Sequence, residues 1–504
     1  MEVNEIFYAW VPKYARHAIL TIMALVALCA NGVYLGITTN MYSDLGVYAE
    51  PYTMATNAMY IGMGGGFLFV GRLAAKASAK SGVIIGFIMM LLMNLICATT
   101  SSPTLTIAAS LVLGFFKVLA IGVIYLALLV IWSKKLDSSR VYPFFYFIAL
   151  AGLYFVTWLT TYVTYLYSWR YAYIVIFILM IFCIVLAVVF FENHELKKKI
   201  PLYQLDIPGL LLLTTSLMLI NYVAVYGKVE DWFNSVAISG ASFGAAIAML
   251  LFIKRELTLK RPILDLNLFK ISNVNVGLFL FLILGVFTPG TFQSALSGGV
   301  LRFELIRNAQ LNLFLIPGIV TGCLLSFFWY KKNYDSHLLI IIGFSAFVVY
   351  HRMMYARFVN DLNMNDFFVP SLFRGFGLAI LYISIGLYTT AKLPIPSTLK
   401  AVGLILFVRQ LFGAGIISGL YNYLLYADTN RHLSGLASQV DSNEPMLSQR
   451  ANFTEYYKYI LQQANLSALK EISGSIIIFG LTVIIILIVV MAYRKIRKGV
   501  PATV

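Results

Sequence analysis

Three basic side chains stand inside long apolar segments of this 504-residue chain: Lys117, Arg374 and Arg409. A cation at membrane depth costs on the order of 3 kcal/mol or more unless it is paired or hydrated. We therefore expect all three to face other helices or a water-filled cavity. A buried lysine can lose its proton, whereas arginine stays charged. Lys117 is thus a candidate for proton exchange or anion binding, and the two arginines for structural bridging or substrate contact.

Uncharged side chains extend this candidate set. Tyr154, Trp158 and Tyr162 recur every fourth residue, which predicts that they share one side of a helix. Such a stripe could stack aromatic or lipophilic molecules, or pack against lipid and neighbouring helices. Asn31 lies within another apolar segment and could line a pore or join helices. The alternative for Lys117 is a lysine that only hydrogen-bonds helix carbonyls and its neighbours.

Residues that would support catalysis are not grouped in this sequence. None of the 21 acidic residues lies in the middle of an apolar segment, and no histidine pair has the spacing of a metal site. The glycine-rich run 62–66 lacks the Lys-Ser/Thr pair of a phosphate-binding loop. We therefore expect no catalytic residues, no metal and no cofactor, and we do not expect an enzyme.

The composition is that of a membrane protein with many spans. Hydrophobic residues make up 60% of the chain and charged residues 12%, against 45–50% and about 25% in soluble domains. Apolar runs of about 20 residues predict helices that cross a lipid bilayer. The net charge of +16 comes from basic residues between these runs. Membrane topology explains that charge, so we expect no nucleic-acid partner.

The apolar runs predict fourteen spans. They are residues 16–38, 53–74, 81–100, 105–132, 142–166, 170–191, 206–226, 235–253, 274–297, 309–330, 336–354, 367–391, 400–425 and 472–493. Of the 37 Lys and Arg residues, 24 fall on the side that holds both termini, 10 on the other side and three within spans. Because basic residues favour the cytoplasm, we expect both termini to be cytoplasmic.

The longest predicted external segment is a polar loop over residues 427–471. Its final part, residues 453–469, has apolar and aromatic residues at helical spacing, which predicts an amphipathic helix. This segment could form a lid on the mouth of the protein. The alternative is a docking surface for a partner such as a periplasmic adaptor.

Several stretches resemble the major facilitator superfamily, and specifically its fourteen-span drug:proton antiporter branch. The matching stretches are 205–209, which opens the seventh span; 168–170, which opens the sixth; 261–269; 372–377; and 408–415. The resemblance implies an all-α fold of two six-helix bundles with two inserted helices. It assigns residues 1–191 to the first bundle, 192–273 to the linker with the inserted spans, and 274–504 to the second bundle.

The same resemblance implies a bacterial inner-membrane transporter that exports small molecules by proton exchange. Several coupling motifs of the branch are altered here. Ala30 stands where the branch carries an acidic residue, Lys117 stands at the place of an arginine, and residues 156–161 lack the antiporter signature. The cytoplasmic gating loop keeps Gly71, Arg72 and Lys76 but has alanine in place of its aspartate.

Three functional hypotheses follow. The first is a secondary transporter that exports lipophilic or aromatic small molecules, with proton coupling. The second is a facilitator-fold transporter of one endogenous compound, such as a lipid, siderophore or pigment, with other coupling or none. The third is a membrane scaffold or sensor that transports nothing. A solvated cavity between the two bundles would favour the first two hypotheses over the third.

Overall fold

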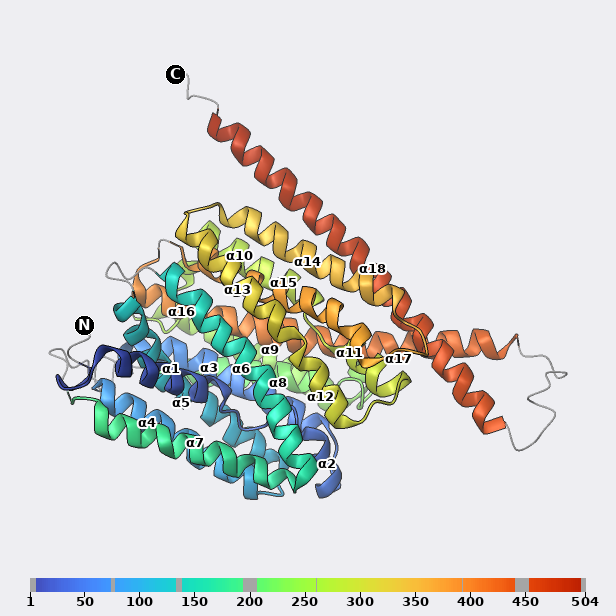
Figure 1. The fold of residues 1–504 in the computed structure, drawn as a ribbon, viewed down its shortest axis with the longest axis horizontal. Helices are drawn as coiled ribbons and strands as arrows, with labels where there is room; N and C mark the ends of the chain where they lie inside the picture. Colours follow the sequence, from blue (N-terminus) through green and yellow to red (C-terminus); the bar gives the residue numbers. More distant parts are fainter. Residues whose placement is uncertain are drawn as a thin grey trace.

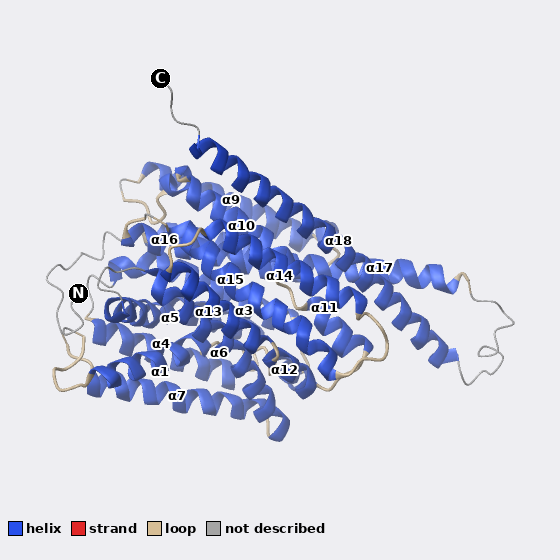
Figure 2. Cartoon of the chain, turned by 45° about the horizontal axis from the view of Figure 1, so that its top comes forward, coloured by secondary structure: helices blue, strands red, loops and turns tan. Residues whose placement is uncertain are grey.

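The apolar segments form helices throughout the computed structural model, which describes residues 6–73, 78–132, 138–193, 206–259, 261–391, 393–439 and 453–499. In chain order the elements are α1 (Lys13–Cys29), α2 (Thr38–Leu45), α3 (Glu50–Leu73), α4 (Ala79–Thr99), α5 (Pro103–Trp132), α6 (Ser138–Leu166), α7 (Trp169–Phe190), α8 (Ile207–Tyr226), η3 (Trp232–Asn234), α9 (Val236–Thr258), η4 (Leu266–Lys270), α10 (Ser272–Phe287), α11 (Thr291–Ser294), η5 (Ala295–Val300), α12 (Leu305–Leu313), α13 (Leu315–Lys331), α14 (Ser336–Ala356), η6 (Met364–Phe367), α15 (Phe368–Thr390), α16 (Ile395–Leu406), η7 (Phe407–Ile416), α17 (Ile417–Ala437) and α18 (Phe453–Gly499). The elements η5 and η7 are π-helices. Figure 2 shows helices joined by short loops.

The expected class, an all-α protein with many membrane spans, is confirmed. Twelve helical segments in the described ranges are long and apolar enough to cross a membrane. They correspond to the third to fourteenth expected spans. The first two are represented by α1, which has only 17 residues, and by α3. The expected count of fourteen is therefore not confirmed.

Two expected spans are interrupted rather than continuous. The first was expected over residues 16–38, but α1 ends at Cys29 and the chain is irregular until α2 begins at Thr38. The ninth was expected over 274–297, but α10 ends at Phe287. Pro289 follows that end and has no backbone N–H to donate, which favours a break there. The first break contains no proline.

Paired glycines bring two helix pairs into backbone contact. In α3 and α5, a Cβ atom at Gly62 would lie 2.0 Å from the carbonyl oxygen of Leu111, and one at Gly114 would lie 1.9 Å from that of Met59. The pair α13 and α15 repeats this arrangement through Gly318. These glycines therefore allow close helix packing.

The buried apolar residues form two clusters. One is built from residues between Ile6 and Phe191, joined by Leu406, and the other mainly from residues between Leu213 and Val483. Helices from the two clusters meet along two seams, in which α6 packs on α12 and α13, and α3 packs on α16 and η7. The seams enclose the central cavity described below.

The segment expected as an external polar loop is largely helical. Helix α17 continues to Ala437, and α18 runs from Phe453 through the last span without a break, so the predicted amphipathic helix is the first part of α18. Both helices extend beyond the rest of the bundle, at the right in Figure 1. The start of α1 and the end of α18 lie toward the opposite end.

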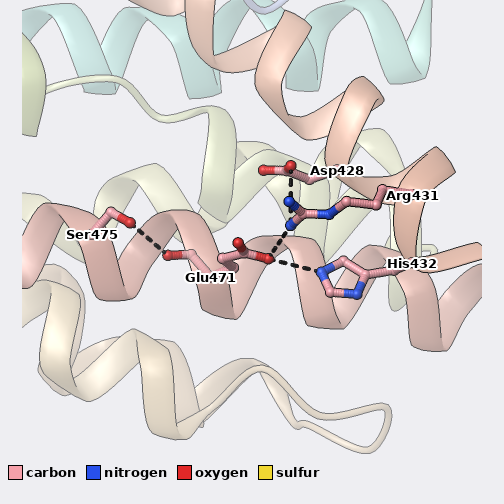
Figure 3. A network of polar contacts seen from close by, with 5 residues as sticks. All are labelled: Asp428, Arg431, His432, Glu471 and Ser475. Atoms are coloured by element: carbon pink, nitrogen blue, oxygen red, sulfur yellow. Dashed lines mark hydrogen bonds and ion pairs between the residues drawn. The ribbon is translucent and has the colours of Figure 1, made fainter. Parts of the chain in front are cut away.

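A polar network ties α17 to α18 near this extension (Figure 3). Glu471 of α18 accepts hydrogen bonds from Arg431 and from Nε2 of His432, the latter at 2.9 Å. Arg431 also contacts Asp428 at 3.3 Å. The side chains of Arg431 and Glu471 are 59% and 47% exposed, so the network adds little stability.

Candidate functional site

A cavity of about 790 Å³ lies between the two clusters of helices. Its walls include Asn31, Lys117 and Tyr154 from the first half of the chain, and Arg374 and Arg409 from the second. Five side chains that the sequence singled out therefore meet at one place. They come from five different parts of the chain: the break after α1, α5, α6, α15 and η7.

Lys117 holds the broken end of α1. Its Nζ atom donates to the carbonyl oxygens of Leu28 at 2.8 Å and Ala30 at 3.0 Å, and to Oδ1 of Asn31 at 2.9 Å. The last carbonyls of a helix have no partner within it, and a cation there is favoured by the helix dipole. An ammonium has three donors, and all three are used. The alternative of a lysine bound to helix carbonyls therefore describes its contacts well.

Side chains of three other helices make further hydrogen bonds with the residues of this break. Tyr34 donates to Oδ1 of Asn94 at 3.0 Å, and Tyr173 donates to the carbonyl oxygen of Gly32 at 2.8 Å. Thr161 donates to the carbonyl oxygen of Gly36 at 3.1 Å. Irregular backbone at membrane depth requires such partners. The segment is thus held in one shape by α4, α6 and α7 as well as by Lys117.

Arg374 holds the broken end of α10 in a similar way. Its Nη2 atom donates to the carbonyl oxygen of Thr288 at 2.9 Å, and its Nη1 atom donates to Oε1 of Gln293 at 3.0 Å. The guanidinium also lies over the ring of Tyr350, 5.6 Å from its centre. Each half therefore has a cation that binds a carbonyl freed by a helix break and an amide side chain beyond the break.

Arg409 has a different environment. It lies in the π-helix η7, where each turn is wider than in an α-helix. Its Nη1 atom donates to the hydroxyl of Tyr146 at 3.4 Å, and its guanidinium covers the ring of Tyr382 at 4.4 Å. Its Nε atom is buried and has no hydrogen-bond partner in the described structure.

The predicted aromatic stripe does not face the cavity as a unit. Tyr154 is in the wall, but Trp158 and Tyr162 are not. Those two rings stack on each other with centres 5.7 Å apart, and Tyr162 is 41% exposed. Thr157 and Thr161 of the same helix line the cavity instead. The physical reason is that a step of four residues turns a helix by about 40° more than one full turn.

The described wall of the cavity holds three cations and no Asp or Glu side chain. Several neutral residues complete the wall but were not predicted from the sequence, among them Gln293, Tyr146 and Tyr382. Tyr146 and Tyr382 lie on α6 and α15, beside predicted residues, but nothing in their spacing distinguishes them from other aromatic residues. The wall is therefore positively charged, with hydroxyl and amide groups between the cations.

The cavity is closed at one end by α3 and the α16–η7 helix. A Cβ atom at Gly64 would lie 2.2 Å from the ring of Phe407, and one at Gly403 would lie 2.9 Å from the carbonyl oxygen of Gly64. Of the predicted gating residues, Gly71 and Arg72 belong to the last turn of α3, beyond this contact. Lys76 lies outside the described residues.

Metal and thiol chemistry find no support in this region. Within the described ranges, no group of three or more His, Cys, Asp or Glu side chains could hold a metal ion. The cysteines Cys29, Cys97, Cys183 and Cys323 are all buried and free. They act as packing residues of the helices.

Comparison with curated proteins finds multidrug transporters at low identity. The chain is 23% identical over 294 residues to the probable multidrug resistance protein EmrY of Escherichia coli, covering 58% of this chain and 56% of that protein. It is 27% identical over 217 residues to the fatty acid resistance protein FarB of Neisseria gonorrhoeae, covering 41% of each. The chain thus spans about half the length of the curated relatives it matches.

Solved structures share the fold. A bacterial homologue of the human drug peptide transporters PepT1 and PepT2 has a TM-score of 0.55 at 12% identity and covers 96% of this chain and 99% of its own. The nucleoside transporter NupG has a TM-score of 0.53 at 12% identity, covering 93% and 99%. The model of the Major Facilitator Superfamily matches residues 20–416. This chain therefore belongs to the Major Facilitator Superfamily.

Proposed function

We propose that this chain is a secondary transporter that exports lipophilic or aromatic small molecules across the bacterial inner membrane. The observation that carries the proposal is the cavity of about 790 Å³ between the two halves, which has the size of a small-molecule site. Its walls combine apolar side chains such as Leu150 and Leu378 with a few polar groups. A scaffold that binds no small molecule has no need of such a cavity.

The proposed transport cycle moves two bundles, residues 1–191 and 274–504, against each other, with residues 192–273 as the linker and inserted spans. Secondary transporters place their substrate site between two such repeats and expose it to each side in turn. In this structure the cavity reaches Thr38 and Leu305, at the end of the bundle away from the Gly64–Phe407 contact. By the distribution of Lys and Arg, that open end is the external one.

We propose Lys117 as the coupling group, because the described wall of the cavity offers no carboxylate. A charged lysine donates three hydrogen bonds, whereas a neutral amine has two N–H groups and one lone pair. Loss of a proton therefore removes one of the bonds to Leu28, Ala30 or Asn31. Protonation of one atom is thus linked to the shape of the break after α1.

A second candidate is a transporter of one endogenous compound without proton coupling. The observation that favours it is that all three donors of Lys117 are already used by neutral acceptors within the protein. In this second candidate the lysine only holds the helix end. The two candidates differ in whether a proton gradient drives accumulation.

Proteoliposomes that contain the full chain test both candidates. An imposed pH gradient should drive accumulation of an aromatic, lipophilic dye by the wild type. Lys117→Arg keeps the charge and cannot titrate, so we expect downhill flux to remain and gradient-driven accumulation to stop. Lys80→Arg is the matched control, because Lys80 also donates to a carbonyl oxygen, that of Val188 at 2.7 Å, away from the cavity.

Two results would decide against parts of this proposal. Flux that the wild type performs equally with and without the gradient would reject proton coupling and favour the second candidate. Dye movement no faster than in protein-free liposomes, over a panel of anionic, neutral and cationic dyes, would contradict the transport function itself.

We also propose that the projecting ends of α17 and α18 bind a periplasmic adaptor protein. They extend beyond the bundle in Figure 1, and Tyr457 and Tyr459 are 49% and 54% exposed there. A photo-crosslinking residue at Tyr459 should capture a protein in cells, whereas one at Ile485, which is exposed on the apolar part of α18, should not. Equal labelling at both positions would reject the docking surface.

A further inference from the structure

We propose that Arg409 anchors the anionic head group of the transported molecule, and that the substrates are organic anions with an aromatic or aliphatic body. The head group would be a carboxylate, sulfonate or phosphate. This inference rests on the proposed transport function and adds the charge class of the substrate.

The charge of the cavity favours an anionic substrate. Lys117, Arg374 and Arg409 all line it, and no described lining residue is acidic. Charges of one sign in a cleft with apolar walls concentrate counter-charged molecules and repel those of the same sign. A lipophilic cation in this cavity would meet three positive groups and no carboxylate to offset them.

The three cations differ in how many of their N–H groups are bonded to the protein. Lys117 uses all three donors on protein acceptors. Arg374 uses both of its terminal nitrogens, on Thr288 and Gln293. Arg409 makes one long hydrogen bond, to Tyr146 at 3.4 Å, and its buried Nε atom has no partner in the described structure. Apart from the buried Nε–H and the N–H bonded to Tyr146, the guanidinium has three further N–H groups that can donate to a ligand.

Two tyrosine side chains hold the Arg409 guanidinium in place. The ring of Tyr382 lies under the guanidinium at 4.4 Å and orients its plane, while Tyr146 binds one edge. A planar, fixed guanidinium suits bidentate binding of a carboxylate or phosphate. A buried cation without a counter-charge is costly, so an anion that completes its hydrogen bonds gains affinity. The protein provides no such anion here.

The remaining wall accommodates the body of the molecule. Met63, Leu150, Leu153 and Leu378 line the same cavity and provide apolar surface. Tyrosine rings beside them can stack on aromatic groups. The site therefore combines one charged group with an apolar surface beside it. This combination fits an amphipathic anion better than a small inorganic one.

Binding to the full chain in lipid nanodiscs tests this site. Three probes share one ring system and differ in head group: a naphthalenesulfonate, the neutral naphthalenesulfonamide and a naphthyltrimethylammonium. We expect calorimetry to show the sulfonate bound about tenfold or more tighter than the sulfonamide, as a charge-assisted bond implies, and the ammonium bound weakest. Arg409→Gln should remove this preference, and Arg409→Lys should restore part of it.

The matched control is Arg352→Gln. Arg352 also lies over a tyrosine ring, Tyr355 at 6.0 Å, but it is exposed and not in the cavity wall. It should keep the full preference for the sulfonate. Thermal unfolding of each variant checks that it is folded, and Tyr146→Phe offers a milder change that frees the Arg409 guanidinium and should keep or increase sulfonate affinity.

Three outcomes would overturn the anion site. They are equal or tighter binding of the ammonium probe, an unchanged sulfonate preference in Arg409→Gln, and no binding of any probe. None of them decides the transport function, which is judged by dye flux in proteoliposomes. A wild-type chain that moves cationic dyes as fast as anionic ones would keep its transport function and lose this proposed site.

Discussion

Each half of the molecule has a broken helix end that a cation binds at the cavity, but the two breaks are buried to different degrees. In each half a helix stops short, and a cation from another helix binds a freed carbonyl and an amide side chain. In the first half the break is enclosed, and a Cβ atom at Gly36 would lie 2.3 Å from the carbonyl oxygen of Thr157. In the second half a Cβ atom at Gly290 would meet the end of the Arg374 side chain, with the Nη2 atom nearest at 3.2 Å.

This difference suggests that the two helix breaks have different roles. The first break is fixed by hydrogen bonds from four helices, α4 to α7, so it acts as a rigid wall. Both breaks line the cavity, the first through Asn31 and Gly36 and the second through Thr288, Pro289 and Gly290, and the second is followed by a π-helix. We therefore expect substitutions at the first break to affect stability, and those at the second to affect transport.

The largest effect is expected for Lys117→Ala. It removes the shared donor of one buried and two partly buried acceptors, and each unsatisfied buried group costs about 1–3 kcal/mol. We expect the free energy of unfolding to fall by about 4 kcal/mol in a denaturant titration of the protein in detergent. Lys80→Ala is the control and should change little. A fall of less than about 1 kcal/mol for Lys117→Ala would mean that water replaces its contacts.

The next largest effect is expected for Gly36→Ala. Backbone atoms of α6 cannot move away as a flexible side chain can, so overpacking should cost about 3 kcal/mol. Gly290→Ala is the matched change at the other break and should cost about 0.5 kcal/mol or less, since only the end of Arg374 must shift. Equal losses of stability in the two variants would remove the distinction between a rigid and an open break.

A smaller stability effect but a larger transport effect is expected for Arg374→Ala. It frees the Thr288 carbonyl and the Gln293 amide, but both lie at the cavity wall, where water can replace a donor. We expect a loss of about 1–2 kcal/mol in stability, together with dye flux reduced well below that of Gly290→Ala. Normal flux in Arg374→Ala would show that the second break does not need its cation.

The smallest effect concerns α2, which follows the first break. A hydrogen bond from Nε1 of Trp169, and then one from Arg170, hold the pKa of Asp44 below its ordinary value. Because the folded-state pKa is depressed, this stabilisation is present above the unfolded pKa of about 3.9 and is lost as the pH falls through the folded value. Asp44→Asn should flatten the acid limb of the stability curve below about pH 4. An unchanged acid limb would show that α2 is not held by this contact.

Much of the fold could be predicted from the sequence because hydropathy reports directly on membrane spans. The positions of Lys117, Arg374 and Arg409 could be predicted as well, because a cation at membrane depth needs a polar environment. The break after α1 had no such signal. No proline lies between Cys29 and Thr38, and the break depends on Lys117 and Tyr173, which come from distant parts of the chain.

The failure of the aromatic stripe has a simple geometric cause. At about 100° per residue, a step of four residues turns a helix by about 40° beyond a full turn, so Tyr162 points about 80° away from Tyr154. A step of seven residues leaves an offset of only about 20°, and residue seven after Tyr154 is Thr161, which does line the cavity. Over two turns, spacing by sevens predicts a shared face better than spacing by fours.

Accessibility of the cavity from the two sides of the membrane tests the central claim most directly. The native cysteines are buried, so a single new cysteine can be labelled in the wild-type background. Thr157→Cys lines the cavity, and Ile124→Cys is the control because Ile124 is fully buried. We predict that a membrane-impermeant thiol reagent labels Thr157→Cys in right-side-out and in inverted vesicles, but leaves Ile124→Cys unlabelled in both. Labelling of Thr157→Cys from one side only, under all substrate and pH conditions, would contradict alternating access through this cavity.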